Sequence, residues 1–390
     1  MKQVIKKVKN NINDMDKPLL MVTVIFFIFG LLNIVTASSR EAVVRYDTSL
    51  YHYFWSQLMM LGIGTVGSLI IINTESKHYK WIAPILYFII LGIIISLSLF
   101  GEEHKGAINW ITLFGFTFQP SEFAKPILIV FLAVLYETFA RKLKNKRINH
   151  YDMISIILLV SFLIPVIVFF QKDFGTMFIT CVVVGTMFLA SPILRTEKVK
   201  TIGLLILLLF CGCCLLLAKK GYIFNEAQMA RFDFFNPCSD YETGGYQVCN
   251  GFIALNDGGL FGLGIGKSKQ KYSYIPEPHT DSVFAIVGEE IGLLWSTLIF
   301  IAYIFILKRI LNLASIANTT RGKFICLGVA TYIFMHILVN LGGLFGIMPL
   351  TGVPLPFLSY GGSFTISLIA SLAIVQRIHI ETKNQKIKIK

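Results

Sequence analysis

Residues Gly244 to Leu294 read GGYQVCNGFIALNDGGLFGLGIGKSKQKYSYIPEPHTDSVFAIVGEEIGLL. They end the longest polar interval of an otherwise apolar chain, and near Val283 they pass directly into a new apolar run. Just before this run, residues Pro276 to Asp281 (PEPHTD) form an ionisable cluster. A carboxylate at the mouth of a membrane helix is costly unless it is paired, solvated or used in chemistry. We therefore interpret the stretch as the entry of a membrane helix beside a candidate functional site.

The composition of the whole chain indicates a membrane protein. Hydrophobic residues make up 55% of the 390 positions and charged residues only 15%, which is far from the average of soluble domains. Apolar runs of about 18 to 20 residues recur along the chain, and a helix of that length spans a bilayer. A transmembrane β-barrel would show alternating segments of about ten residues instead. The sequence therefore predicts an all-α polytopic membrane protein with one membrane domain.

The apolar runs predict ten transmembrane helices between residues 19 and 376, after a basic N-terminus (1–18) and before a basic tail (377–390). The first is expected to be an uncleaved anchor, because the apolar core of a signal peptide is usually shorter. A large polar loop, 219–282, separates the seventh helix from the eighth. The ten helices are expected at 19–36, 53–72, 81–99, 122–140, 151–170, 176–190, 201–218, 283–307, 324–341 and 363–376.

The distribution of positive charge predicts the orientation. The two termini and every second loop hold 24 of the 35 Lys and Arg residues, whereas the opposite loops hold ten. By the positive-inside rule, both termini are expected in the cytoplasm and the large loop outside. The net charge of +13 is thus a topology signal and an attraction to anionic lipid rather than a sign of nucleic-acid binding. In an oxidising exterior, Cys238 and Cys249 of the large loop could form a disulfide.

This topology gathers the unusual polar residues on the external face, which is typical of a site. Asp281 has two interpretations. It could cap the eighth helix or interact with the dipole of that helix, since Asp is favoured at helix N-termini. It could instead be a general base, which needs an ionised carboxylate that reaches a substrate hydroxyl, and His279 and Glu277 could then tune it. The other external candidates are Trp110, Gln119, Pro120, Ser121, Glu122, Gln171, Asp173 and the segment 354–363.

Four further ionisable residues lie within predicted helices. Glu289 and Glu290 are eight and nine residues beyond Asp281, about 12 Å deeper at helical rise, and acids buried in a span usually face a partner or a wet cavity. For them we expect a structural ion pair rather than catalysis. Glu122 and Lys125 share one helix face. They could pair with each other, or Lys125 could meet an anionic substrate group while Glu122 positions a cation.

Two segments have a composition that a regular helix does not explain. Residues 258–268, GGLFGLGIGKS, end like a P-loop, but Phe261 stands where that motif needs Gly. Close packing or a re-entrant path explains these glycines better. Residues 349–363, PLTGVPLPFLSYGGS, cannot form a continuous helix. We expect them to shape a wall of the site, with Ser359 and Ser363 as optional hydrogen-bonding groups.

These motifs resemble those of the SEDS family of bacterial cell-wall proteins, which includes FtsW, RodA and SpoVE. The segment KSKQKYSYIPEP at 267–278 is more similar to the division-type FtsW or SpoVE form than to the elongation-type RodA form. The matching pieces keep the family's order over the whole chain: GAINW at 106–110, FQPSEFAK at 118–125, QKDFGT at 171–176, GGLFGLGIGKSKQKYSYIPEPHTD at 258–281, GEEIGL at 288–293 and PLTGVPLPFLSYGGS at 349–363.

The resemblance implies a peptidoglycan glycosyltransferase that polymerises lipid II at the outer face of the bacterial cytoplasmic membrane. By motif position, Asp281 matches the family's essential aspartate, Trp110 its external tryptophan, and Glu122 and Lys125 its Glu/Lys pair. The chain departs from the pattern at Lys172 (usually Pro), Ser282 (usually Phe) and Asn109 (often basic), and the last argues against a phosphate role for that loop. The candidate substrate-binding residues are Glu122, Lys125, Trp110, His279, Glu277, Asp173, Gln171, Ser359 and Ser363.

The resemblance also implies partners. These are a polyprenyl-linked glycan strand, a class B penicillin-binding protein as transpeptidase, and divisome or elongasome proteins. The pyrophosphate leaving group needs its charge neutralised, by Lys125, by an arginine such as Arg231 or by a divalent cation such as Mg²⁺ or Mn²⁺. The rival function is a flippase of the lipid-linked precursor. A flippase should place polar residues through the whole membrane, whereas here they crowd one face, with Glu289 and Glu290 as the main exceptions.

Overall fold

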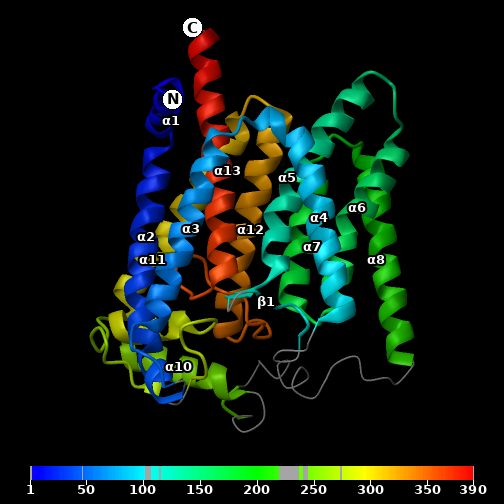
Figure 1. Cartoon of the computed structure of the whole chain (residues 1–390). Coiled ribbons are helices and arrows are strands. Elements are labelled where there is room, and N and C mark those ends of the chain that lie inside the picture. The colour runs from blue at the N-terminus through cyan, green and yellow to red at the C-terminus, as the bar shows by residue number, and fades with distance from the viewer. Residues whose placement is uncertain are drawn as a thin grey trace.

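A computed structural model describes residues 2–45, 47–101, 107–113, 116–218, 237–239, 245–272 and 275–389. Each of the ten predicted spans corresponds to one helix, and eight of these helices are long and apolar enough to cross a membrane in the described part of the chain. The all-α polytopic fold is therefore confirmed (Figure 1). The ten are α2 (Lys17–Arg40), α3 (His52–Asn73), α4 (Tyr79–Phe100), α5 (Pro120–Lys144), α6 (His150–Phe170), α7 (Phe174–Ala190), α8 (Arg195–Ala218), α11 (Val283–Ile316), α12 (Thr320–Leu344) and α13 (Gly362–Ile389).

Helices α5, α12 and α13 form the centre of the bundle, and α8 lies at its edge (Figure 1). The most apolar windows of α5, α12 and α13 are 72%, 78% and 72% buried within the protein, against 17% for α3. Polar groups on the central helices are therefore shielded from lipid and must find partners inside the bundle.

Both chain termini lie at the same end of the bundle, as the charge pattern predicts (Figure 1). We call this the terminal end, where α1 (Lys2–Asn13) and η2 (Ser76–His78) lie. The opposite end, which we call the site end, carries η1 (Glu41–Arg45), α10 (Tyr246–Gly258) and η5 (Gln270–Tyr272). The assignment of the terminal end to the cytoplasm stays a prediction.

A β-hairpin occupies the connection between α4 and α5, which we had expected to be loop. Strand β1 (Ile111–Leu113) pairs antiparallel with β2 (Phe116–Phe118), with Thr112 opposite Thr117. The hairpin is joined to the bundle where Gln119 N–H donates to Ser363 Oγ at 2.9 Å. Segments of three residues are too short to show alternation in the sequence. The hairpin therefore closes the site end beside the start of α13.

The eighth predicted span is not a continuous helix. Gly292 adopts φ 77° and ψ 178°, which interrupts α11 nine residues after its start. The span predicted over 283–307 is therefore helical with one break, because a glycine with positive φ interrupts the regular hydrogen-bond ladder. The helix then resumes and runs to Ile316, beyond the predicted end.

The segment from Phe345 to Gly361 is non-helical and reaches deep into the bundle, as its prolines predict. Phe357 has φ 70°, and its ring stacks on Phe26, near the middle of α2, at 5.3 Å between centroids. Tyr303 of α11 donates its hydroxyl to Pro356 O at 2.6 Å. A Cβ at Gly30 would lie 2.0 Å from Phe357 O. The glycine therefore makes room for this segment to pack against α2.

The described part of the large loop is compact. A disulfide joins Cys238 to Cys249, as the sequence analysis allowed. Helix α10 lies against α11 at the site end (Figure 1). Arg231 lies outside the described residues, so its predicted role in neutralising the leaving group stays a prediction.

Candidate functional site

Asp281 lies in a turn immediately before α11 and does not cap this helix. Thr280 N–H donates to Glu277 O at 3.0 Å, which closes the turn. The N-cap residue of α11 is Ser282, and no side chain makes a capping hydrogen bond there. The N-cap interpretation of Asp281 is therefore wrong, whereas an interaction of its partly exposed carboxylate with the helix dipole stays a prediction.

Two neutral side chains contact the carboxylate of Asp281. Its Oδ1 accepts from Gln247 Nε2 at 3.2 Å and lies 3.3 Å from Thr280 Oγ1, whose single proton has a closer acceptor in Glu277 O at 2.8 Å. Gln247, on α10, also donates to Ser282 Oγ at 2.8 Å. A Cβ at Gly352 would lie 3.9 Å from Oδ2, so the carboxylate faces the deep segment that follows α12. Amide and hydroxyl donors orient a carboxylate without cancelling its charge.

Asn340 of α12 fixes the main chain of Asp281, and the sequence analysis did not identify it. Its Nδ2 donates to Asp281 O at 2.7 Å and to Val353 O at 2.8 Å. The side chain is 2% exposed. One amide has two N–H groups, so it can join two carbonyls that no helix or sheet ladder pairs. Its signal in the sequence is a single Asn in an apolar span, which does not reveal its partners.

A buried network formed by Glu122, Lys125 and His336 lies against the non-helical segment that follows α12. Lys125 Nζ lies 2.7 Å from Glu122 Oε1 and 3.0 Å from His336 Nε2. His336 Nδ1 lies 3.2 Å from Pro354 O, which can only accept, so we assign the ring proton to Nδ1. The predicted pairing of Glu122 with Lys125 is confirmed. Sequence analysis missed His336, one helical turn from Asn340 on α12.

His279 connects the turn of Asp281 to α2 and α3. Its Nδ1 lies 3.3 Å from Glu41 Oε2, and its ring centroid lies 4.3 Å from that of Tyr53. Its carbonyl accepts from Tyr360 N–H at 2.8 Å. The side chain is 3% exposed. His279 thus positions the turn from inside the protein, while its predicted role in tuning Asp281 stays a prediction.

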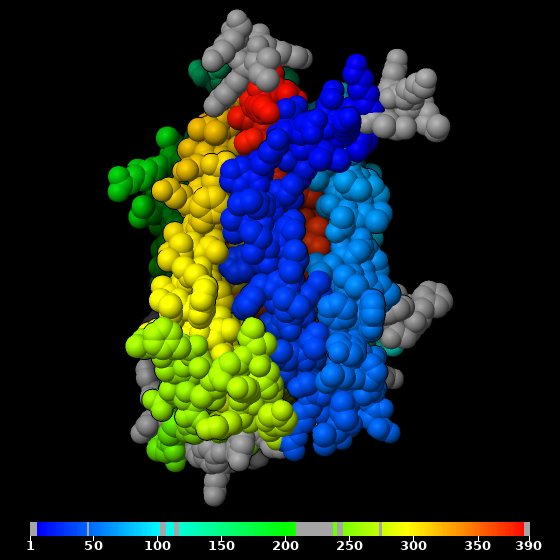
Figure 2. Space-filling view, turned by 90° about the vertical axis from the view of Figure 1, so that its left-hand side faces the viewer, coloured from blue at the N-terminus to red at the C-terminus, as the bar shows by residue number. Residues whose placement is uncertain are grey.

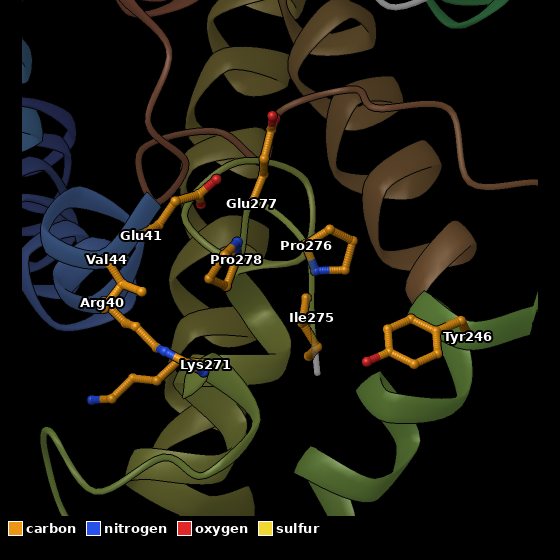
Figure 3. A pocket seen from close by; sticks show the side chains of 9 residues that line it. All are labelled: Arg40, Glu41, Val44, Tyr246, Lys271, Ile275, Pro276, Glu277 and Pro278. Carbon is orange, nitrogen blue, oxygen red and sulfur yellow. The ribbon is translucent and has the colours of Figure 1, made fainter. Parts of the chain in front are cut away.

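Glu277 lines a cavity of about 310 Å³ beside the turn of Asp281 (Figure 3). Figure 3 shows the Arg40 and Lys271 side chains near one another at one side, and those of Glu41 and Glu277 at another. The cavity thus has both charged and apolar walls. One of its lining residues, Glu277, precedes Asp281 by four positions in the sequence. Its lining residues are Arg40, Glu41, Val44, Tyr246, Lys271, Ile275, Pro276, Glu277 and Pro278.

Four other candidate residues make hydrogen bonds that hold the loops of the site end. Asp173 Oδ1 caps α7 by accepting from Thr176 N at 3.0 Å, and its Oδ2 accepts from Asn109 and Gln119 at 2.9 Å each. The remaining three residues act similarly: Gln171 Nε2 donates to Ile94 O (3.0 Å) and Ser98 Oγ (2.9 Å), Ser359 Oγ accepts from Leu355 N (2.8 Å), and Ser363 Oγ accepts from Gln119 N (2.9 Å). Direct contact of these four with substrate stays a prediction.

Trp110 differs from those four residues because it is 37% exposed at the start of the hairpin. The neighbouring Asn109 donates its side-chain amide to Asp173 Oδ2 at 2.9 Å. Asn109 therefore holds this loop to α7. An exposed indole could contact a ligand, and that role of Trp110 stays a prediction.

Of the two acids deeper in α11, Glu290 forms the predicted structural ion pair, whereas Glu289 is held by hydrogen bonds from the main chain. Glu290 Oε1 lies 2.9 Å from Lys271 Nζ, with both side chains at most 3% exposed. Glu289 accepts from Lys269 N at 2.7 Å and from Gln270 N at 3.3 Å. These contacts are with the segment after α10, so both carboxylates join two parts of the same protein.

The family comparison agrees with the motifs. The family of cell cycle proteins that comprises FtsW, RodA and SpoVE matches residues 17–384. This chain belongs to that family. The match extends from the start of α2 into the last turns of α13, so it includes every residue of the site described above.

Relatives within the SEDS family support the FtsW-type resemblance. The chain is 31% identical over 382 residues to the probable peptidoglycan glycosyltransferase FtsW of Bacillus subtilis, covering 96% of this chain and 93% of that protein. It is 30% identical over 368 residues to the stage V sporulation protein E of the same organism, covering 93% and 96%.

Solved structures of SEDS proteins share the fold. A chain of a peptidoglycan synthase complex, in which polymerisation and crosslinking are coordinated, superposes with a TM-score of 0.74 at 22% identity and covers 94% of this chain and 98% of that one. Thermus thermophilus RodA superposes with a TM-score of 0.67 at 22% identity, covering 94% and 96%. The ten-helix arrangement is thus the SEDS fold.

The SEDS chain brings no metal site together in its described part. Over the described ranges, no three His, Cys, Asp or Glu side chains are grouped to hold an ion. A divalent cation that neutralises the leaving group therefore stays a prediction.

Proposed function

We propose that this chain is a peptidoglycan glycosyltransferase that polymerises lipid II, with Asp281 as the general base. One observation carries the residue assignment: a partly exposed carboxylate at the site end is fixed through its main chain by Asn340 and accepts from Gln247, and it belongs to the same turn as Glu277, which lines a cavity. The names of the curated relatives support the reaction class. The assignment of the base rests on the geometry of this chain.

The geometry suits a displacement at a sugar carbon. The acceptor's sugar hydroxyl attacks the donor's anomeric carbon, a new C–O bond forms, and the bond to the polyprenyl pyrophosphate breaks. Asp281 takes the hydroxyl proton as the attack proceeds, which requires a carboxylate that is ionised and held in place. The pyrophosphate leaves as an anion, so its departure needs a positive group rather than a proton. Arg40 lines the cavity, and Lys125, Arg231 or a divalent cation are alternatives.

We further propose that the site end faces the outside of the bacterial cytoplasmic membrane and that both termini are cytoplasmic. The excess of Lys and Arg at the terminal end supports this orientation. A class B penicillin-binding protein is the proposed partner. Its support is the similarity to a chain of a complex that coordinates polymerisation with crosslinking.

The flippase alternative has less support. Such a protein needs a polar path through the bilayer, and the deepest acids of α11 contact the segment after α10 instead. The other candidate residues gather at the site end, which is the arrangement that a reaction on one face requires.

A reconstituted assay with fluorescent lipid II and the transpeptidase partner tests the proposal. Replacing Asp281 by Asn keeps the size of the side chain and removes its basicity, so we expect glycan synthesis to fall by about 100-fold or more. Asp257→Asn is the matched control, because Asp257 is also a carboxylate at the site end but contacts Lys269 at 3.8 Å. We expect this variant to retain parental activity.

The outcomes separate the claims. If Asp281→Asn polymerises lipid II at the parental rate, the assignment of the base is wrong while the enzyme class stands. If the parental protein forms no glycan but moves lipid II across vesicle membranes, the flippase function replaces the polymerase.

A further inference from the structure

At the break in α11, a loop that follows α10 supplies partners for the backbone groups that lose their helical hydrogen bonds. In a continuous helix, Leu293 and Leu294 N–H would donate to the carbonyls of Glu289 and Glu290. Here those carbonyls accept from Leu263 N at 2.9 Å and Gly264 N at 3.0 Å. The displaced donors are also satisfied: Leu293 N donates to Gly259 O at 2.9 Å, and Leu294 N donates to Leu260 O at 3.1 Å. The loop and the helix thus exchange two pairs of hydrogen bonds.

The contact between loop and helix is made by backbone and requires glycine. Gly262 has φ +81°, and a Cβ there would lie 2.3 Å from Glu290 O. Lys271 Nζ, which pairs with Glu290, also donates to Gly266 O at 2.7 Å. Non-helical backbone is tolerated within a membrane where its polar groups have partners in the protein. The N–H groups of Leu263 and Gly264 and the carbonyls of Gly259 and Leu260 have such partners in α11.

The position of the break along α11 places the loop within the apolar layer. Lys308 and Arg309 end the apolar part of the helix toward the terminal end. A span of about 20 residues crosses the hydrocarbon core, so the other boundary falls near Gly288. Gly292 then lies about 6 Å inside the core at helical rise. Figures 1 and 2 show the segment after α10 against α11 on the side of the bundle.

The side chains at the tip of the loop are apolar and point outward. Leu260 is 62% exposed, and Phe261 and Ile265 are each 76% exposed. They lie next to Leu293 and Leu294 of α11, which are 61% and 54% exposed. Exposed apolar side chains on a membrane-spanning helix face lipid, and the loop continues this surface. In a loop surrounded by water, the same side chains would be an unfavourable exposed patch.

We propose that Gly259 to Gly266 form a re-entrant segment whose Leu260, Phe261 and Ile265 side chains contact lipid acyl chains in the leaflet at the site end. The segment is thus embedded in the membrane rather than part of an aqueous loop. Lys267 and Lys269 follow the tip and are exposed, so they mark the level of the lipid headgroups, where long basic side chains are favourable. This inference does not depend on the proposed enzymatic activity.

Depth-dependent fluorescence quenching tests this inference on the full chain in phosphatidylcholine vesicles. A single cysteine replaces Phe261 in a background in which the cysteines outside the Cys238–Cys249 disulfide are alanine, and an environment-sensitive dye labels it. We expect lipids that carry a spin label near the headgroup to reduce its fluorescence more than lipids labelled near the end of the acyl chain. Leu298→Cys, near mid-span, should show the reverse order, and Lys146→Cys should respond to an aqueous quencher.

Quenching of the Phe261 position by the aqueous quencher alone would overturn the proposal, and so would protection from every quencher. Ile265→Cys provides an independent second position, so a poorly folded Phe261 variant does not leave the question unanswered. The proposal requires that both tip positions, in folded protein, report the shallow hydrocarbon layer.

Discussion

The two ends of the bundle both contain carboxylates in buried ion pairs, and the site end also carries a carboxylate of another kind. At the terminal end, Asp16 pairs with Arg309 at 2.7 Å, Glu137 with Arg321 at 3.3 Å, and Glu381 with Arg377 at 2.9 Å. At the site end, Glu122 pairs with Lys125 at 2.7 Å and Glu290 with Lys271 at 2.9 Å. The Asp281 carboxylate there is partly exposed and accepts a hydrogen bond from the amide of Gln247.

The comparison shows two uses of a carboxylate, one in holding helices together and one that suits a reaction. An arginine that neutralises a buried carboxylate locks two helices together and lowers the basicity of that carboxylate. Neutral donors fix the direction of a carboxylate and leave its charge available to a reacting hydroxyl. A protein that needs both can therefore hold them in one bundle, as the paired Glu290 and the partly exposed Asp281 of the site end illustrate.

Removal of Arg321 should have the largest effect on stability. Arg321→Met leaves Glu137 as a buried charge without this partner, so we expect a loss of about 3–5 kcal/mol in the free energy of unfolding. Arg141→Met is the matched control, because Arg141 contacts the same carboxylate at 3.2 Å but its side chain is 64% exposed. The control should cost at most about 1 kcal/mol.

Thermal unfolding in detergent gives the melting temperature of both variants. The turnover of lipid II per folded molecule shows whether the site is still intact. If the comparison holds, Arg321→Met lowers the melting temperature without lowering the turnover of the molecules that remain folded. Equal destabilisation by the two arginine variants would contradict it.

Asn340→Ala should have an intermediate effect and should act at the site end. It leaves Asp281 O and Val353 O without a buried donor, which costs about 1–3 kcal/mol, and it releases the turn that carries the proposed base. We expect kcat for lipid II polymerisation to fall with little change in KM. Thr331→Val is the control on the same helix, because Thr331 donates to Leu327 O within its own helix.

The pH dependence of activity distinguishes a role of Asn340 in positioning Asp281 from a role in stability alone. Asn340→Ala should shift the acidic limb of the activity profile, whereas Thr331→Val should leave it in place. If Asn340→Ala lowers the melting temperature but leaves kcat unchanged, Asn340 supports the fold and has no positioning role.

Glu75 at the terminal end should show the smallest effect. Hydrogen bonds from Lys77 and then Lys7 lower the pKa of this carboxyl from 4.5 to about 2. Because its folded-state pKa is depressed, the pairing stabilises the protein above about pH 4.5, and this contribution is lost as the pH falls toward 2. The pair is partly exposed, so the effect is small. Melting temperatures of Glu75→Gln and the parent should differ at pH 6 and converge near pH 2, and a constant difference would exclude this linkage.

Hydrophobic run length was sufficient to predict ten helices, because the thickness of the bilayer sets a local requirement on the chain. Turn chemistry predicted that residues 349–363 would not be helical, since prolines and glycines act through their own backbone. Both termini at one end followed from the even number of spans and the alternation of charge. Helical spacing predicted the pairing of Glu122 with Lys125, three residues apart.

The contacts of Asn340 and His336 could not be predicted in this way. Asn340 joins carbonyls 59 and 13 residues away, and no local pattern indicates which carbonyls lack a partner. The break at Gly292 depends equally on a loop about thirty residues earlier, whose backbone replaces the missing helical bonds. Hydrogen bonds between distant segments form only where packing brings their groups within about 3 Å, and for that reason the geometry around Asp281 is a property of the assembled bundle.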